Sequence, residues 1–467
     1  MITKLKPLTL AALISAVIVS CSEQKEEQHD KDKPFASRYQ AQEYAPVFIK
    51  NATVLTATGE QIDNGSVYFK DGKIVEVGED LSEPGDDDLL VIDADGKWVT
   101  PGIIDVHSHL GVYPAPGVQT SADGNEMTAP VTAEVWAEHS VWPQDPQFSL
   151  ALAGGVTSMQ ILPGSANLVG GRGVTLKNVL GRTVMDMKFP NAPHGMKMAC
   201  GENPKRVYGS KGRAPATRMG NVAGYRASWI KAQDYKKQWD AYNKSVENGK
   251  PGKKPKRDLQ METLMGVLNG EILVHNHCYR ADEMAVMLDI AKEFGYKVST
   301  FHHAIESYKI ADLLAENEVC SAMWSDWWGF KQEAYDTVAE NVALVDKAGA
   351  CAVVHSDSAV GIQHLNKDAA KAMTSGNKMG LDIKPKDAIK WITINAAKSL
   401  GVEEHTGSLE AGKMADLVIW DGNPFSVYAK AEKVFIDGAL KYDRDDKTVQ
   451  PSSDFDLGVL KPQENRL

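Results

Sequence analysis

Cysteine is scarce in this chain, with five residues in 467, and no two of them form a Cys-x-x-Cys pair. Without such a pair, thiolate ligation of a metal is not expected, and oxygen and imidazole groups are the better candidate ligands. Four cysteines lie far apart in apolar, strand-like segments: Cys200, Cys278, Cys320 and Cys351. A large protein with its own core does not need disulfides, so we expect these four to be buried free thiols.

Positive charge is also in deficit, because 51 Lys and Arg stand against 62 Asp and Glu, a net charge of −11. This balance repels a phosphate backbone and argues against a general nucleic-acid-binding protein. No repeat of 20–50 residues stands out, and 39 Gly and 21 Pro are too few for a collagen-like or disordered chain. The length exceeds that of one ordinary core, so we expect a large α/β barrel domain plus a small domain.

The first twenty residues read as an export signal. Lys4 and Lys6 precede an apolar run, Leu8 to Val19, that is too short to span a bilayer comfortably. The following Ser20-Cys21 completes a sequence that resembles a bacterial lipobox, in which the cysteine is lipidated and becomes the mature N-terminus. We therefore expect a signal peptide (1–20) and a lipidated tether (21–45), with an ordinary cleaved signal peptide as the alternative. The expected location is the bacterial cell envelope, anchored to the outer membrane and facing the periplasm, with Cys21 as the only membrane contact.

Short alternating segments separated by turn signals fill both ends of the remaining chain, in 46–100 and again in 404–450. We predict that these segments form one β-sandwich domain built from both ends, followed by a C-terminal tail (451–467). The middle, 101–403, alternates apolar runs with helical periods, which is typical of a parallel (β/α)8 TIM-like barrel. The eight candidate strands are Gly102–His107, Val156–Leu162, Val174–Lys177, Met196–Gly201, Ile272–His277, Lys297–His303, Val319–Trp324 and Ala350–Asp357.

A long polar insertion, 203–270, separates the fourth and fifth candidate strands. Its 203–257 portion carries fifteen Lys and Arg but only three acids. Such a charge run is usually a solvated helical face, and the alternative is a lid that attracts anionic substrates.

Histidine carries the strongest chemical signal. The first barrel strand ends in His107-Ser108-His109, and the strand period of two places both imidazoles on one side. Later candidate strands also end in histidine or carboxylate: His275 and His277, His302 and His303, then Asp357. Because barrel strands converge at their C-terminal ends, these groups are predicted to meet, and imidazole with carboxylate suits Zn²⁺ or a similar divalent ion.

Several longer stretches resemble the metal-dependent amidohydrolase superfamily, and within it the imidazolonepropionase-like branch that includes Xaa-Pro dipeptidases. They include VTPGIIDVHSHLG (99–111), GVTSMQILPGSANLVGG (155–171), HCYRADEM (277–284), HHAIESYKIADLL (302–314) and HSDSAV (355–360). The resemblance implies that one or two metal ions are held by His107, His109, His277, His303 and Asp357.

The fourth-strand ligand stays open between two residues of MKMACGE (196–202). Lys197 resembles a lysine that is carboxylated in many members, whereas Glu202 stands where strand-end ligands belong and is slightly favoured. Either residue has a structural alternative, such as an acid at a helix N-terminus for Glu202.

The resemblance implies hydrolysis of a C–N amide bond, of the peptide or N-acyl amino acid type, by a metal-bound hydroxide with Asp357 as general acid and base. The alternatives are opening of a cyclic amide, as in imidazolonepropionase, and a catalytically silent lipoprotein that uses the barrel as a binding scaffold. We expect Arg206, Tyr208 and Trp328 to bind a small substrate that carries a carboxylate. A homo-oligomer is compatible with these expectations, and nucleic acid is not an expected partner.

Overall fold

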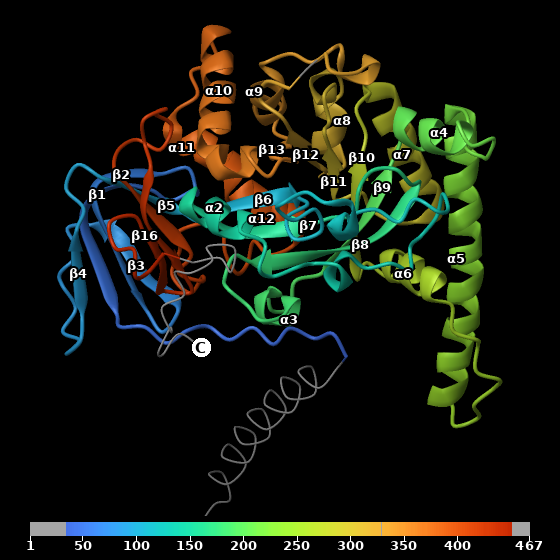
Figure 1. Ribbon diagram of the computed structural model, residues 1–467, viewed down its shortest axis with the longest axis horizontal. Helices are drawn as coiled ribbons and strands as arrows, with labels where there is room; N and C mark the ends of the chain where they lie inside the picture. The colour runs from blue at the N-terminus through green and yellow to red at the C-terminus, as the bar shows by residue number, and fades with distance from the viewer. Residues whose placement is uncertain (1–33, 328, 451–467) are drawn as a thin grey trace, which may run out of the picture.

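The computed structural model describes residues 34–327 and 329–450, which form two eight-stranded sheets with helices around one of them (Figure 1). The α/β class and the barrel are as predicted. The barrel strands follow the chain in order, and their bounds are β6 (Ile103–Ser108), β7 (Val156–Ile161), β8 (Val169–Lys177), β9 (His194–Ala199), β10 (Ile272–His277), β11 (Thr300–His302), β12 (Cys320–Met323) and β13 (Cys351–Val354).

One barrel strand departs from the predicted all-parallel arrangement. β8 pairs antiparallel with both β7 and β9, while the other neighbouring pairs are parallel. The chain between β7 and β8, residues 162–168, is too short for a crossover helix, so the strand must return in the opposite direction. The expected third parallel strand is therefore wrong in direction and begins five residues earlier than predicted.

Contacts between the first and last strands bring the sheet close to a closed barrel. The Asp357 N–H just after β13 donates to the carbonyl of His107 on β6, at 3.0 Å. The Ser356 hydroxyl and backbone N–H both donate to the Asp105 carboxylate on β6. These bonds join the two sheet edges at the end of the barrel where the predicted ligands lie.

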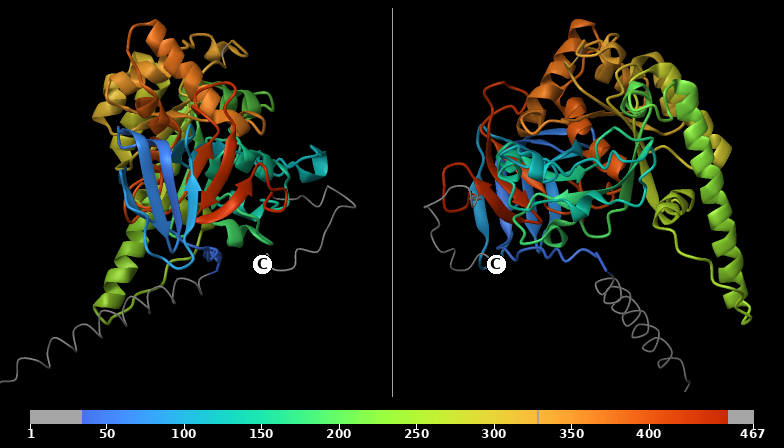
Figure 2. Two further views of the ribbon diagram at one scale, coloured as in Figure 1. Left: turned by 90° about the vertical axis from the view of Figure 1, so that its left-hand side faces the viewer. Right: turned by 45° about the vertical axis from the view of Figure 1, so that its right-hand side comes forward.

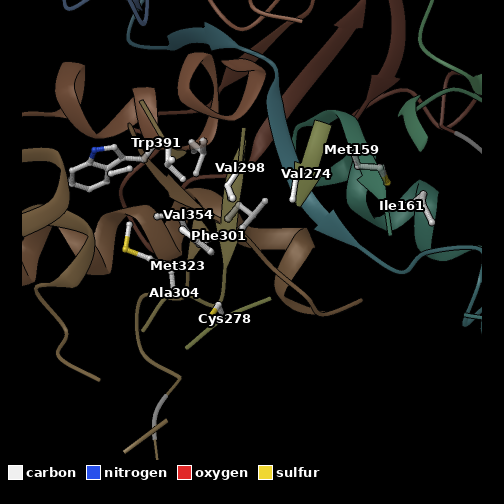
Figure 3. Close-up of a cluster of buried hydrophobic side chains, with 14 of the residues drawn as sticks. Met159, Ile161, Val274, Cys278, Val298, Phe301, Ala304, Met323, Val354 and Trp391 are labelled. Carbon is white, nitrogen blue, oxygen red and sulfur yellow. The ribbon is translucent and has the colours of Figure 1, made fainter. Parts of the chain in front are cut away.

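The apolar core lies between the barrel and its helices. Met159, Ile161, Val274 and Phe301 alternate along their strands with inward-facing polar residues, and all four are fully buried (Figure 3). Burial of each such side chain contributes about 1.5–3 kcal/mol relative to exposure. The surrounding helices are α2 (Gln147–Ala153), α7 (Ala281–Phe294), α8 (Ala311–Glu316), α9 (Asn341–Lys347), α10 (Leu365–Lys378), α11 (Pro385–Ala388) and α12 (Ile394–Leu400).

The two ends of the chain join in a single hydrogen-bonded sheet. Its order is β16-β15-β14-β5-β1-β2-β3, with β4 also paired to β1. The N-terminal strands are β1 (Val47–Leu55), β2 (Gln61–Lys70), β3 (Lys73–Glu79), β4 (Leu90–Asp93) and β5 (Trp98–Pro101), and the C-terminal ones are β14 (Leu417–Trp420), β15 (Ala431–Ile436) and β16 (Ala439–Asp443). Lys177 of β8 is fully buried and pairs with Asp416 at 3.2 Å and Asp437 at 2.7 Å, which ties the barrel to this sheet.

The basic insertion is helical. It contains α4 (Glu202–Gly209), the 30-residue α5 (Arg218–Glu247) and α6 (Leu259–Leu268). The right-hand view of Figure 2 shows α5 running along the outside of the barrel and extending beyond it. Among the described helices, none combines the length and the apolar composition needed to cross a bilayer.

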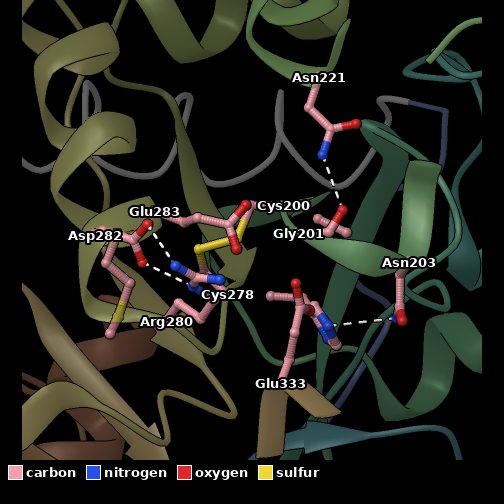
Figure 4. The surroundings of a disulfide bond; sticks show 12 residues. Cys200, Gly201, Asn203, Asn221, Cys278, Arg280, Asp282, Glu283 and Glu333 are labelled. Atoms are coloured by element: carbon pink, nitrogen blue, oxygen red, sulfur yellow. Dashed lines mark hydrogen bonds and ion pairs between the residues drawn. A yellow bond between two sulfur atoms is a disulfide. The ribbon is translucent and has the colours of Figure 1, made fainter. Parts of the chain in front are cut away.

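The four cysteines predicted to be free thiols form two disulfides, Cys200–Cys278 and Cys320–Cys351, so that prediction is wrong. The first pair directly follows β9 and β10, where Ala199 lies opposite His277 (Figure 4). The second pair occupies opposed positions at the starts of β12 and β13. Adjacent strands bring the Cα atoms to 5.2 and 4.4 Å, within the range a disulfide requires. Separations of 78 and 31 residues hide this proximity in the sequence.

Candidate metal centre

Asp357 lies at the centre of a histidine cluster at the C-terminal end of the barrel. Its carboxylate is 3.2 Å from Nε2 of His109, and 3.6 Å from Nε2 of both His107 and His303. These residues come from the ends of β6 and β11 and from the turn after β13. The barrel therefore brings together four side chains that are up to 250 positions apart in the sequence, as expected for groups at strand ends.

Two overlapping groups of side chains in the described part of the chain have the geometry to hold a metal ion. They are His107, His303 and His355, and His107, His109 and Asp357, with ligand atoms within 4.8 Å of one another in each group. Nε2 of His355 and Nδ1 of His303 share a hydrogen bond of 2.7 Å. Four imidazoles and a carboxylate in these two groups fit a divalent metal such as Zn²⁺.

His277 lies at the side of this cluster. Its ring centroid is 4.9 Å from that of His303, and its Nε2 is 3.3 Å from the amide nitrogen of Asn203. Its Nδ1 is buried without a hydrogen-bond partner, although buried polar atoms usually have one. An orphaned ring nitrogen next to the cluster fits the predicted role as a ligand.

The two candidates for the fourth-strand ligand occupy different places. Lys197 is fully buried on β9, with Nζ 3.3 Å from Nε2 of His107. Glu202 begins α4 and lies 3.6 Å from Lys331, lining a neighbouring cavity. This placement favours Lys197 over the slightly preferred Glu202. The reason is that β9 ends at Ala199 and the chain turns at Gly201, with φ of 72°, before it reaches Glu202.

Burial sets the protonation states of the cluster. It lowers the pKa of His107 and His303 well below the usual value, and that of His355 to about 4, so these imidazoles are neutral and available as ligands. Burial also lowers the pKa of Lys197 to about 7, opposed by the nearby Asp357 charge. For Asp357, burial raises the pKa, but the hydrogen bond and charge of His109 and the charge of Lys197 outweigh it and lower the pKa overall. An ionised carboxylate therefore stands beside the neutral rings of His107, His303 and His355 at neutral pH.

Neighbouring groups fix the orientation of these side chains. Nδ1 of His109 lies 2.8 Å from the Leu162 carbonyl, to which it donates, and this bond directs Nε2 toward Asp357. Trp324 stacks on His303 with 4.4 Å between ring centroids. His303 and Asp357 both have positive φ, 55° and 47°, a strained conformation that is concentrated at functional sites.

A cavity of about 450 Å³ opens above Asp357. Its aromatic and cationic lining residues are Tyr113, Tyr279, Trp324, Trp327, Phe330, Arg206 and Lys331. Lys331 places Nζ 4.2 Å from the ring centre of Tyr279 and 3.1 Å from the side-chain oxygen of Asn203. The cavity therefore combines an apolar wall with two positive charges.

The predicted substrate-binding residues have different outcomes. Arg206 lines the cavity, whereas Tyr208 is fully buried and donates to the Ala129 carbonyl at 2.6 Å, away from the lining residues. Trp328 and Cys21 lie outside the described residues. Tyr279 and Lys331 were missed; Tyr279 could have been found because it follows the His277 strand end by two positions, but no pattern marks Lys331.

Comparison with known proteins gives a consistent result. The model of the Amidohydrolase family matches residues 240–450. The structure of an amidohydrolase from Thermotoga maritima MSB8 is 37% identical, with a TM-score of 0.77, and the match covers 85% of this chain and all of that one. Amidohydrolase tasK of Hapsidospora irregularis is 32% identical over 397 residues, and the match covers 81% of this chain but only 40% of that protein. Imidazolonepropionase of Fusobacterium nucleatum is 24% identical over 379 residues, covering 77% of this chain and 85% of the relative. With its histidine cluster at the C-terminal end of the barrel, the chain belongs to the amidohydrolase family and is a metal-dependent enzyme of that family.

Proposed function

We propose that this enzyme hydrolyses a C–N amide bond in a small substrate that carries a carboxylate, of the peptide or N-acyl amino acid type. The observation that carries the proposal is the ionised Asp357 carboxylate, which lies within 3.6 Å of His107, His109 and His303 and lines an open cavity. His107, His109, His277, His303, Asp357 and Lys197 are the residues that would hold one or two divalent ions, with Zn²⁺ as the proposed metal. Such an ion, when bound, polarises a carbonyl oxygen and lowers the pKa of a water molecule.

The residues of the chain supply the proton transfers. Asp357 accepts the proton of the attacking water through its carboxylate, which its lowered pKa keeps ionised. It then returns this proton to the leaving nitrogen, which completes hydrolysis with no net change in the protein. His109 orients the carboxylate through the 3.2 Å contact, and Trp324 holds His303 in place by stacking.

A substrate panel tests the reaction class. Dipeptides, N-acyl amino acids and cyclic amides are to be assayed with Zn²⁺, with Mn²⁺ and after chelation. Turnover of a linear amide that is lost with the metal and restored by it is the expected result. Turnover of the cyclic amides alone would support the imidazolonepropionase-type alternative, which the 24% identical relative favours. Metal binding without any turnover would support the silent scaffold.

The Arg206 guanidinium is proposed to bind the substrate carboxylate. A bidentate contact in a partly enclosed cavity is worth about 1.5–3 kcal/mol. Arg206→Ala is therefore expected to lower kcat/KM for a dipeptide with a free C-terminus by about 10- to 100-fold, and to spare the corresponding C-terminal amide. The control is Lys253→Ala, on the exposed part of the insertion, which should alter only the salt dependence. Equal losses on both substrates would show that Arg206 has a structural role instead.

The cell envelope is the proposed location, with a lipid on Cys21 as the anchor to the outer membrane. Two disulfides support a compartment outside the cytoplasm, because such bonds persist in oxidising environments. Full-length protein is expected to incorporate labelled fatty acid and to fractionate with membranes, and Cys21→Ala should abolish both. Wild-type protein that takes up no label would contradict the anchor.

A further inference from the structure

A chain of three contacts runs inward from His107, away from the substrate cavity. Nδ1 of His107 is 3.0 Å from Nδ1 of His302, and Nε2 of His302 is 2.9 Å from Nδ1 of His275. Nε2 of His275 then lies 3.3 Å from the side-chain amide of Gln160. All four side chains are fully buried, on β6, β11, β10 and β7, and the proposed reaction uses only the first of them.

The two end groups of this series of contacts, His107 and Gln160, determine the direction of its hydrogen bonds. The rings of His302 and His275 are fully buried and contact only other imidazoles and an amide along this series, so burial favours the neutral form of each ring, which carries one N–H. A neutral imidazole that accepts on one nitrogen must donate from the other. The three rings therefore have two self-consistent arrangements, with every N–H pointing toward Gln160 or every N–H pointing toward His107.

Only one arrangement leaves His107 able to hold a metal. Nε2 of His107 faces Asp357 and Lys197, so it must be unprotonated to act as a ligand. Nδ1 of His107 must then donate to His302, His302 must donate to His275, and His275 must donate to Gln160. The last step requires an acceptor on Gln160.

Gln160 has an acceptor to offer. Its Oε1 is buried without a hydrogen-bond partner, and the amide nitrogen and oxygen exchange places by a half-turn of the amide group. After this turn Oε1 accepts from Nε2 of His275, and the amide nitrogen takes the former place of Oε1. Gln160 and His275 lie against Gly195, which has no side chain. A Cβ atom at this position would lie 2.6 Å from both the Gln160 amide and the His275 ring, too close for either group to stay in place.

We propose that Gln160, His275 and His302 are positioning residues that fix His107 in the tautomer with Nδ1 protonated and Nε2 free for the metal. This inference concerns metal binding and rests on the metal-dependent part of the proposed function, not on the choice of substrate. The Gln160 amide oxygen is the terminal acceptor of the chain. Without it, the arrangement that frees Nε2 of His107 leaves the Nε2–H of His275 buried and unpaired, which costs free energy.

Zinc affinity in a set of variants tests the coupling, measured by competition with a chelator. Gln160→Met removes the acceptor and is expected to weaken Zn²⁺ binding by about 10- to 100-fold. His302→Asn offers an amide oxygen directly to Nδ1 of His107, so its affinity should stay within about threefold of the wild type. In the His302→Asn background, Gln160→Met should weaken Zn²⁺ binding by less than about a further threefold, because the series of hydrogen bonds from Gln160 no longer reaches His107. Thr175→Val, which removes a buried hydroxyl opposite Gln160 on β8, is the matched control and should change nothing.

Nitrogen NMR of the histidine rings in the zinc-loaded wild-type protein provides a second readout that needs neither a substrate nor a variant. His302 and His275 are expected as Nε2–H tautomers. Nδ1–H tautomers, unchanged affinity in Gln160→Met, or additive losses in the double variant would overturn the proposal. If Gln160→Met does not fold, the wild-type tautomers still decide it. Failure of every amide substrate, with these tautomers observed, would reject the proposed reaction and leave the positioning role intact.

Discussion

Replacement of Asp357 by asparagine is expected to lower kcat by about 10²–10⁴-fold, with the fold intact. The amide has nearly the shape of the carboxylate but can neither accept the proton of the attacking water nor hold it for the leaving nitrogen. The carboxylate also lies within 3.6 Å of three imidazoles, so its charge contributes to metal binding. Hydrolysis should be measured at saturating metal, which separates the proton-transfer defect from weaker loading.

Asp326→Asn is the matched control for this experiment. Asp326 lies in the loop after β12, half-exposed, and pairs with Lys371 at 2.8 Å, outside the lining of the cavity. Its substitution should leave kcat within about twofold, since exposed ion pairs contribute little. Full activity of the Asp357 variant at saturating metal would show that another group carries the proton.

Substitution of Lys197 by methionine is expected to weaken zinc binding by about 100-fold or more, whereas Glu202→Gln should leave it within about threefold. Lys197 lies against Nε2 of His107, while Glu202 contacts Lys331 beside a different cavity. A loss of metal would favour Lys197, in its carboxylated form, as the fourth-strand ligand. The opposite order of effects would restore Glu202 to that role.

The lowered pKa of Lys197 is expected to make zinc affinity depend on pH. Because burial lowers its pKa to about 7, the amine is charged below that pH and neutral above it, and only the neutral amine reacts with CO₂ to form a carbamate. Zinc affinity should therefore fall as the pH decreases through about 7, a range in which His107 and His303 remain neutral.

The metal-free protein offers a complementary measurement. The folded pKa of Lys197 lies below its unfolded value, so the stability of the metal-free protein should rise with pH between about 7 and 10. The methionine variant lacks this buried amine and should be as stable as the wild type or more so when metal-free. A variant that loses both metal and stability would instead indicate a structural lysine.

Strand parity and the convergence of strand ends predicted from the sequence that four side chains of the candidate site would lie close together. His107 and His109 share one side of a strand, and His303 and Asp357 follow later strand ends, so convergence of parallel strands brings them together. The same periodicity does not reveal strand direction, which is why the reversal of β8 was missed. The disulfides were missed because they depend on which strands are neighbours and in what register, as for Cys320 opposite Cys351.

The choice between Lys197 and Glu202 depends on where the fourth strand ends. The apolar pattern extended the fourth strand to Gly201, but the strand ends two residues earlier. A two-residue error in the boundary moves the apparent strand end from one candidate to the other. Lys331 could not be found at all, because its place in the cavity depends on the path of a loop that carries no periodic signal.

The terminal sheet makes folding depend on the order of synthesis. β14 pairs with β5, and the Trp420 side chain donates to the hydroxyl of Thr100, 320 residues earlier in the chain. At a synthesis rate of about 5–20 residues per second, roughly 15–60 s pass before this partner exists. During that time the nascent β5 edge is unpaired, and closure over so long a loop is slow. Protease resistance of residues 47–101 is therefore expected only after the last strands have emerged, so the part of the chain that is made early becomes stable late.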